Sequence, residues 1–176
     1  MRHILILTAA CACALTAALV HVHSVAAEST GLPNPGDLQA KIDTYRKVTW
    51  RWQRLMGRPL TIQLPAPRPP LEQRVPLWKA HSTRMQRLAQ KPPHKRQWLC
   101  IHGYEGRWAS NTGNGYYGGL QMDYGFMRTY GRELLRRKGT ADHWTPLEQI
   151  WVAERAYRSG RGFYPWPNTA RYCGLI

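Results

Sequence analysis

The segment 111–119, NTGNGYYGG, limits what this chain can fold into more than any other part of its 176 residues. Four of the nine residues are glycine and two are asparagine. Both residue types readily adopt positive φ and fit tight turns, whereas they destabilise a helix. The segment therefore predicts a turn-rich loop, and 120–122 after it is expected to form a short strand.

Helical patterns flank this loop on both sides. Residues 98–103 are expected to form the end of a helix before it. After it, Asp123 is a typical N-cap residue for a helix expected over 123–138, which the next glycine stops. A further helix is expected over 145–159, which opens with the N-cap threonine, N1 proline and N3 glutamate of a capping box. These patterns predict a mainly helical α+β domain over 98–176 with one short β-like element.

The preceding stretch, 28–97, is a different kind of sequence. It contains 14 Lys and Arg against 4 acidic residues, and 10 of the 13 prolines. Apolar residues at helical spacing predict one helix over 37–57, with an aspartate as N-cap, and a second over 77–89. A proline-rich link, 59–76, is expected between them. We expect a helical extension that packs on the domain, because its tryptophans are costly to expose; a basic surface for a wall or membrane is the other interpretation.

The first 27 residues have the parts of a secretory signal peptide. Arg2 supplies a positive start, 4–20 is an apolar run, and 25–27 are small residues suited to cleavage before Glu28. A retained membrane anchor, or a lipid anchor on Cys11, is the alternative. No later apolar run is long enough to cross a bilayer, so we expect a secreted chain with no integral membrane segment after cleavage.

The cysteines support one disulfide. Cys11 and Cys13 would leave with the signal peptide, so Cys100 and Cys173 remain to pair in an oxidising compartment. A zinc site is the other interpretation, but two cysteines without CxxC or HxxxH spacing argue against it. No phosphate-binding, metalloprotease or serine-hydrolase motif occurs either. We therefore expect no metal and no cofactor.

The charge balance favours a polyanionic partner. The chain has 25 Lys and Arg against 10 Asp and Glu, a formal net charge of +15. Nucleic acid, an anionic membrane surface and an anionic cell wall all fit such a charge. Secretion argues against nucleic acid, so we expect none as a partner.

Glu105 is the candidate catalytic residue. It is the only acidic residue between Glu72 and Asp123, and it lies at an expected helix end between Tyr104 and Trp108. A carboxyl group held against aromatic rings loses hydration, which favours its protonated form. Such an acid can protonate a departing glycosidic oxygen. Aromatic faces suit sugar rings, and amides suit hydroxyl and N-acetyl groups. The candidate substrate-binding residues are Trp108, Asn111, Thr112, Tyr116, Tyr117 and Gln121.

The string NTGNGYYGGLQ at 111–121 resembles the signature of the transglycosylase-like domain of resuscitation-promoting factors. These are actinobacterial muralytic proteins of the cell wall with a lysozyme-like fold. The resemblance continues in register through 148–154 and a Trp-Pro pair at 166–167, and covers about 96–176. It implies a small lysozyme-like helical core and one catalytic glutamate just before the signature, which is Glu105.

The same resemblance implies a substrate and a location. Tyr116 and Gln121 fall where the family lines its sugar cleft. The expected partner is the glycan strand of peptidoglycan, cut between N-acetylmuramic acid (MurNAc) and N-acetylglucosamine (GlcNAc) by a secreted, wall-located enzyme that we expect to be a monomer.

Two questions stay open at the level of sequence. Asp123 is either a second carboxylate, which stabilises an oxocarbenium ion or positions water, or only the cap of its helix. The substrate's own 6-hydroxyl could attack to give an anhydro product, whereas hydrolysis needs a positioned water.

The chain also departs from the family pattern. In the family the catalytic glutamate directly follows a cysteine, but here Cys100 lies five positions before Glu105, and the link from Glu105 to Asn111 is two residues shorter. The alternative function is therefore a non-catalytic module that binds peptidoglycan in a lysozyme-like cleft.

Overall fold

The computed structural model describes residues 34–64 and 68–176. The predicted signal peptide, 1–27, lies outside the described residues. Helices dominate the described part, and one antiparallel pair of two-residue strands accompanies them, so the expected α+β class is confirmed. None of the described helices combines the length and apolar character needed to span a bilayer.

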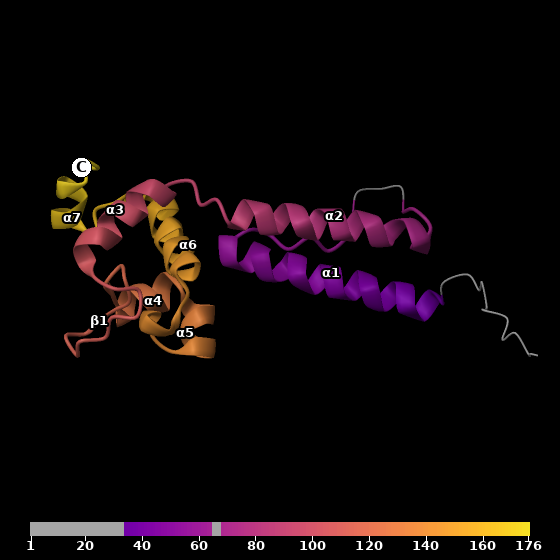
Figure 1. Cartoon of the computed structure of the whole chain (residues 1–176), viewed down its shortest axis with the longest axis horizontal. Helices are drawn as coiled ribbons and strands as arrows, with labels where there is room; N and C mark the ends of the chain where they lie inside the picture. The colour runs from indigo at the N-terminus through magenta and orange to yellow at the C-terminus, as the bar shows by residue number, and fades with distance from the viewer. Residues whose placement is uncertain (1–33, 65–67) are drawn as a thin grey trace, which may run out of the picture. The chain divides into compact units, whose positions relative to one another are not determined.

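The elements follow one another as shown in Figure 1. Their bounds are α1 Pro35–Met56, α2 Leu71–Ala89, α3 Lys95–Glu105, β1 Tyr116–Tyr117, β2 Met122–Asp123, α4 Tyr124–Tyr130, α5 Arg132–Lys138, the 3₁₀ turn η1 Ala141–His143, α6 Pro146–Ala156, the π-helical turn η2 Tyr157–Arg161, and α7 Pro167–Tyr172.

Helix α6 is the centre of the C-terminal half and contacts α1, α3 and α4. Nearly all its side chains are buried, including Ile150, Val152 and Ala153, as expected of a helix covered on every side. The predicted capping box is present, with Thr145 and Glu148 bonded reciprocally. The helix ends at Ala156, earlier than expected, and η2 continues the turn.

The helix expected over 123–138 is two helices. Gly131 separates α4 from α5, and a Cβ atom at this position would lie 2.5 Å from the Trp144 ring. The glycine therefore lets a buried tryptophan pack directly on the backbone. The C-terminal end is as predicted, because α5 stops at Lys138 before Gly139.

The two N-terminal helices begin earlier than predicted. Asn34, not Asp37, caps α1 by accepting a hydrogen bond from the backbone of Gly36. Helix α2 begins at Leu71 and includes Pro76, which the sequence pattern places in the link. The proline lies in the second turn, so the helix loses one hydrogen bond but continues.

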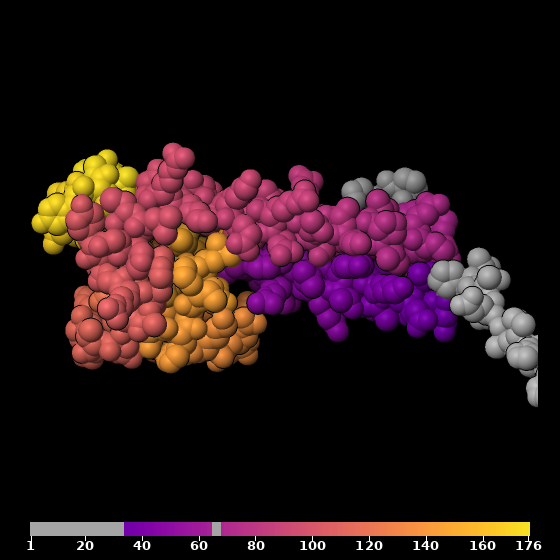
Figure 2. Space-filling model, in the orientation of Figure 1, coloured from indigo at the N-terminus to yellow at the C-terminus, as the bar shows by residue number. Residues whose placement is uncertain are grey.

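Helices α1 and α2 lie side by side and run in the same direction (Figure 1), and their atoms are in contact along the pair (Figure 2). The connection between them runs back along the helices and is held at Thr61. Its carbonyl accepts from the Trp50 indole at 2.7 Å, and its hydroxyl contacts Gln53 and His81. A parallel pair needs such a return segment, which explains the long link.

Polar side chains near the end of α6 meet the C-terminal ends of both helices. The guanidinium of Arg155 donates to the carbonyls of Arg54 and Leu55 at 2.8 and 2.7 Å. The Trp151 indole donates to the carbonyl of Ala89 at 2.8 Å. The last carbonyls of a helix have no partner within it, so these contacts satisfy groups that would otherwise lack one. These contacts of α6 with the ends of α1 and α2 are the ones expected if the helical extension packs on the domain.

Candidate active site

Glu105 is the last residue of α3, and the backbone turns away directly after it. Gly106 adopts φ 149°, and a Cβ atom there would lie 3.2 Å from the hydroxyl of Ser110. The buried side chains of Trp98 and Ile101 fix the other face of α3 in the core. The acid therefore stands at the end of a rigid helix, where a glycine-rich loop begins.

The C-terminal helix α7 holds the carboxylate. The hydroxyl of Thr169 donates a hydrogen bond to Oε1 of Glu105 at 2.8 Å. A disulfide joins Cys100 in α3 to Cys173, the residue after α7, with 6.1 Å between the Cα atoms. The predicted pairing is thus confirmed, and it fixes α7 beside the helix that carries the acid.

A surface hollow of about 280 Å³ opens beside Glu105. The side chains around it combine a carboxylate, amides and aromatic rings, which is the chemistry expected of a sugar site. The lining residues are Glu105, Asn114, Tyr116, Gln121, Pro165, Trp166, Pro167 and Asn168.

The glycine-rich loop supplies one wall of this hollow. It forms the predicted turns, with positive φ at Gly113, Gly115 and Gly118. The strand expected over 120–122 is β2, at Met122–Asp123, and it pairs with β1, which the sequence pattern had placed inside the loop. The Tyr116 side chain on β1 is 48% exposed and borders the hollow.

Gln121 has a conformation that few residues adopt. Among the described residues it is the one non-glycine with positive φ, 47°. Its amide Nε2 donates to the carbonyl of Gly118 at 2.8 Å, which fixes the side chain at the hollow. Strained backbone of this kind is found at sites where the position of a side chain matters.

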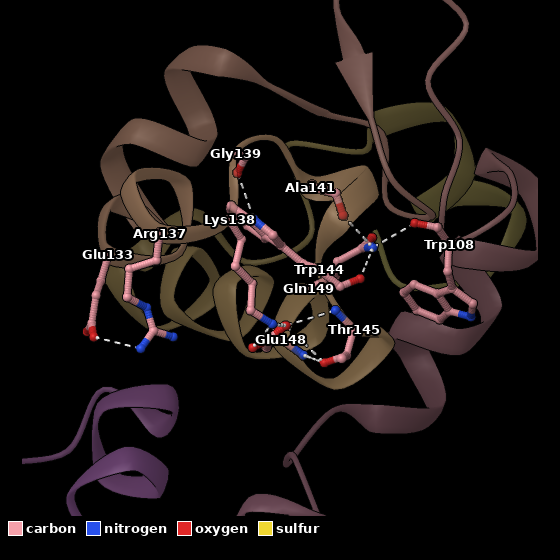
Figure 3. A network of polar contacts seen from close by, with 10 residues as sticks. All are labelled: Trp108, Glu133, Arg137, Lys138, Gly139, Ala141, Trp144, Thr145, Glu148 and Gln149. Atoms are coloured by element: carbon pink, nitrogen blue, oxygen red, sulfur yellow. Dashed lines mark hydrogen bonds and ion pairs between the residues drawn. The ribbon is translucent and has the colours of Figure 1, made fainter.

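One buried side chain, that of Gln149 on α6, holds the loop in place. Its Oε1 accepts from the backbone of Gly119 at 2.8 Å. Its Nε2 donates to the carbonyls of Trp108 and Ala141 at 2.8 Å (Figure 3). A Cβ atom at Gly118 would lie 2.5 Å from Oε1 of Gln149. The glycines therefore allow the loop backbone to approach this amide.

Trp166 lines the hollow and is not among the predicted site residues. Its indole donates to the carbonyl of Leu120 at 2.6 Å, and only 5% of the residue is exposed. The sequence signal for it is the Trp-Pro pair at 166–167, which supports the family resemblance but does not by itself indicate a place in the site. Thr169 lies a further turn along and carries no local signal at all.

Asp123 lines a second hollow, of about 380 Å³. This hollow shares Tyr116, Gln121, Pro165 and Trp166 with the first. The two are therefore parts of one groove, here called the cleft. Asp123 is also the helix cap that the sequence allowed, because its Oδ1 accepts from the backbone of Phe126 at 2.6 Å.

The other predicted binding residues lie away from the lining of the cleft. Trp108 stacks on His102, with 3.8 Å between ring centroids. Asn111 donates to Oδ2 of Asp142 at 3.3 Å. Tyr117 packs against the core, and Thr112 is exposed in the loop. Tyr116 and Gln121 are thus the two predicted binding residues that the structure brings together with Glu105.

Two other carboxylates, those of Asp142 and Glu154, form hydrogen bonds within the fold and do not line the cleft. The pKa of Asp142 lies below its ordinary value; burial raises it, but hydrogen bonds, including those from Thr140 and Asn111, outweigh this effect. Glu154 is fully buried and accepts from the indole of Trp98 at 2.9 Å and from the backbone of His94 at 2.8 Å.

Across 34–64 and 68–176, no three His, Cys, Asp or Glu side chains are grouped as metal ligands would be.

A mainly helical domain with a carboxylate, amides and aromatic rings along one cleft fits the class of small lysozyme-like domains. Residues 95–169 match the family described as Transglycosylase-like domain. Residues 95–169 therefore carry a transglycosylase-like domain.

Two relatives support this assignment. Resuscitation-promoting factor RpfE of Mycobacterium tuberculosis is 38% identical over 103 residues, which are 58% of this chain and 50% of RpfE. Resuscitation-promoting factor Rpf1 of Corynebacterium glutamicum is 41% identical over 70 residues, which are 40% of this chain and 35% of Rpf1. The chain is thus matched to half or less of the length of these relatives.

Proposed function

We propose that the domain cleaves peptidoglycan at the bond between MurNAc and GlcNAc, outside the cell, with Glu105 as general acid. The observation that carries the proposal is the position of Glu105 at the edge of a hollow that Tyr116, Gln121 and Trp166 also line. The match of residues 95–169 to the Transglycosylase-like domain family supports a glycan substrate, because a transglycosylase transfers glycosyl groups.

The hydrogen bond from Thr169 defines how the acid would work. Because the hydroxyl donates to Oε1 of Glu105, the transferable proton belongs on the other oxygen, Oε2. After this proton passes to the glycosidic oxygen, the same hydrogen bond stabilises the carboxylate that forms. The sugar then carries oxocarbenium character until water or its own 6-hydroxyl attacks.

Asp123 need not take part in this chemistry. Its Oδ1 is already bonded to the backbone of Phe126, so it stabilises α4 whatever else it does. Asp123→Asn keeps an N-cap but removes the charge. We expect this variant to retain most activity; a large loss with the fold intact would assign the charge a part in the reaction.

The decisive experiment compares Glu105→Gln with Glu133→Gln on purified cell walls. The first keeps an acceptor for Thr169 but cannot donate a carboxylic proton; the second removes an exposed carboxylate on α5, away from the cleft. We expect soluble muropeptides from wild type and Glu133→Gln and none from Glu105→Gln. Wall binding without products from wild type would instead indicate a non-catalytic module.

Mass spectrometry of the products separates the two fates of the sugar. A hydrolytic product has a free reducing end, whereas attack by the 6-hydroxyl gives an anhydro end that is lighter by one water. Either product supports the role of Glu105, because both need the leaving oxygen to be protonated.

A further inference from the structure

The cleft carries opposite charges at its two ends. Glu105 lines the first hollow, whereas Arg128 and Arg161 line the second. The two arginines come from different elements, α4 and η2, and both line the same hollow. Two guanidinium groups on the wall of a glycan-binding groove favour a glycan that carries an anionic substituent, because a guanidinium binds a carboxylate more strongly than a neutral hydroxyl group.

Neither arginine is neutralised by the described part of the chain. The ion pairs found within 34–64 and 68–176 involve other side chains. Asp123 is the one acid that lines this hollow, and one of its oxygens is committed to the cap of α4. The arginine end therefore keeps a positive charge that a ligand can use.

Tyr130 lines the same hollow as Arg161. The hydroxyl of Ser159 donates to Oη of Tyr130 at 3.3 Å. The pKa of Tyr130 lies below its ordinary value because of this bond, and, against the effect of burial, because of a hydrogen bond and the positive charge of Arg161. The positive charge of Arg161 therefore acts on a second group of the hollow, the Tyr130 phenol.

We propose that Arg128 and Arg161 form a carboxylate subsite that binds the acidic group carried by MurNAc next to the bond that is cleaved. The inference rests on the proposed function, because it takes peptidoglycan as the substrate. The sugar rings of the strand are uncharged, and its carboxylates lie on the lactyl group of MurNAc or on the peptide attached to it. A guanidinium binds a carboxylate through charge-assisted hydrogen bonds with defined geometry.

This subsite would give the cleft a direction. A strand can place its acidic substituent at the arginine end only when MurNAc occupies the second hollow. The neighbouring sugar then lies at the first hollow, where Glu105 reaches the linking oxygen. The subsite would thus select which of the two alternating bonds of the strand is presented to the acid.

The test measures binding to the Glu105→Gln protein, so that turnover is not needed. Three tetrasaccharides are titrated by calorimetry: a peptide-bearing GlcNAc–MurNAc strand, the same strand with free lactyl groups after amidase treatment, and chitotetraose, which has no carboxylate. We expect each of the two carboxylate-bearing tetrasaccharides to bind about tenfold more tightly than chitotetraose, which is the value of one charge-assisted contact. The tighter of these two tetrasaccharides identifies whether the bound carboxylate belongs to the peptide or to the lactyl group.

Arg128→Gln with Arg161→Gln should remove most of this difference. Arg136→Gln is the matched control, because it removes an exposed guanidinium from α5 outside both hollows. Raising the salt concentration should also reduce the difference, since it screens exposed charges.

Three results would overturn the subsite: equal binding of all three ligands, an equal loss for all three in the double variant, or no binding of any. Retained activity of Glu105→Gln would instead contradict the proposed acid and leave the binding test unaffected.

Discussion

The hydroxyl of Thr169 lies 2.8 Å from Oε1 of Glu105, although 64 positions separate the two residues. The tail of the chain therefore orients the proposed acid. Its helix, α7, is joined covalently to α3 by the disulfide between Cys100 and Cys173. The disulfide and the hydrogen bond thus both connect α3 with the region of α7. The disulfide therefore helps to fix the position of Glu105 in the cleft.

We predict that Thr169→Val lowers the rate of muropeptide release by about tenfold, the value of one hydrogen bond to a charged group. The substitution keeps the shape of the side chain but removes the donor to Glu105. Thr169→Ser should retain most of the activity, because it keeps the hydroxyl. Circular dichroism should show both variants folded; equal activity of Thr169→Val and wild type would show that the bond does not serve the reaction.

Gln149→Leu should destabilise the protein by at least about 3 kcal/mol, because several buried groups lose their partners at once. The backbone of Gly119 and the carbonyls of Trp108 and Ala141 would be left unpaired. Urea denaturation measures the loss. Gln73→Leu makes the same change at an exposed position of α2 and should have little effect; a similar result for both variants would contradict the role of Gln149.

Much of the fold can be predicted from local sequence. The capping box at Thr145 and Glu148 sets the start of α6, and the glycines of 111–119 predict the loop, because these signals depend on backbone chemistry within a few residues. The break between α4 and α5 is harder to predict. Gly131 is tolerated within many helices, and the reason for the break here is a tryptophan 13 residues later.

The cleft is predictable only in part. Glu105, Tyr116 and Gln121 belong to one stretch of sequence that carries a signature. Trp166 and Thr169 join them from the far end of the domain, through contacts that no local pattern encodes. Aromatic residues adjacent to Glu105 in the sequence were expected to shield it, but Trp108 stacks on His102 instead.

Removing the disulfide should cost both stability and activity. The double variant Cys100→Ser with Cys173→Ser leaves no free thiol at the site, and the chain-entropy model predicts a loss of about 4 kcal/mol in the free energy of unfolding. Activity should fall as well, because α7 carries Thr169. Urea denaturation and muropeptide release measure the two effects. An unchanged denaturation midpoint would contradict the expected stabilisation.

The pH dependence of stability should reflect Glu148. Burial raises the pKa of this carboxyl, but hydrogen bonds from Lys138 and Thr145 and the charge of Lys138 bring it below its ordinary value of 4.5. Lys138 Nζ lies 2.7 Å from both carboxylate oxygens (Figure 3). Because the pKa is lowered in the folded state, the stabilisation is complete above pH 4.5 and is lost as the pH falls through the folded-state pKa.

The variant Glu148→Gln tests whether stability depends on pH in this direction. The variant should be less stable than wild type near neutral pH, and the difference should shrink as the pH is lowered below 4.5, because the wild-type carboxylate is then protonated. Urea denaturation at a series of pH values measures it. Glu133→Gln is the control, since the exposed carboxylate of Glu133 lies 3.8 Å from Arg137 and such surface pairs contribute little. A difference between wild type and Glu148→Gln that stays constant with pH would show that the charge of Glu148 does not stabilise the fold.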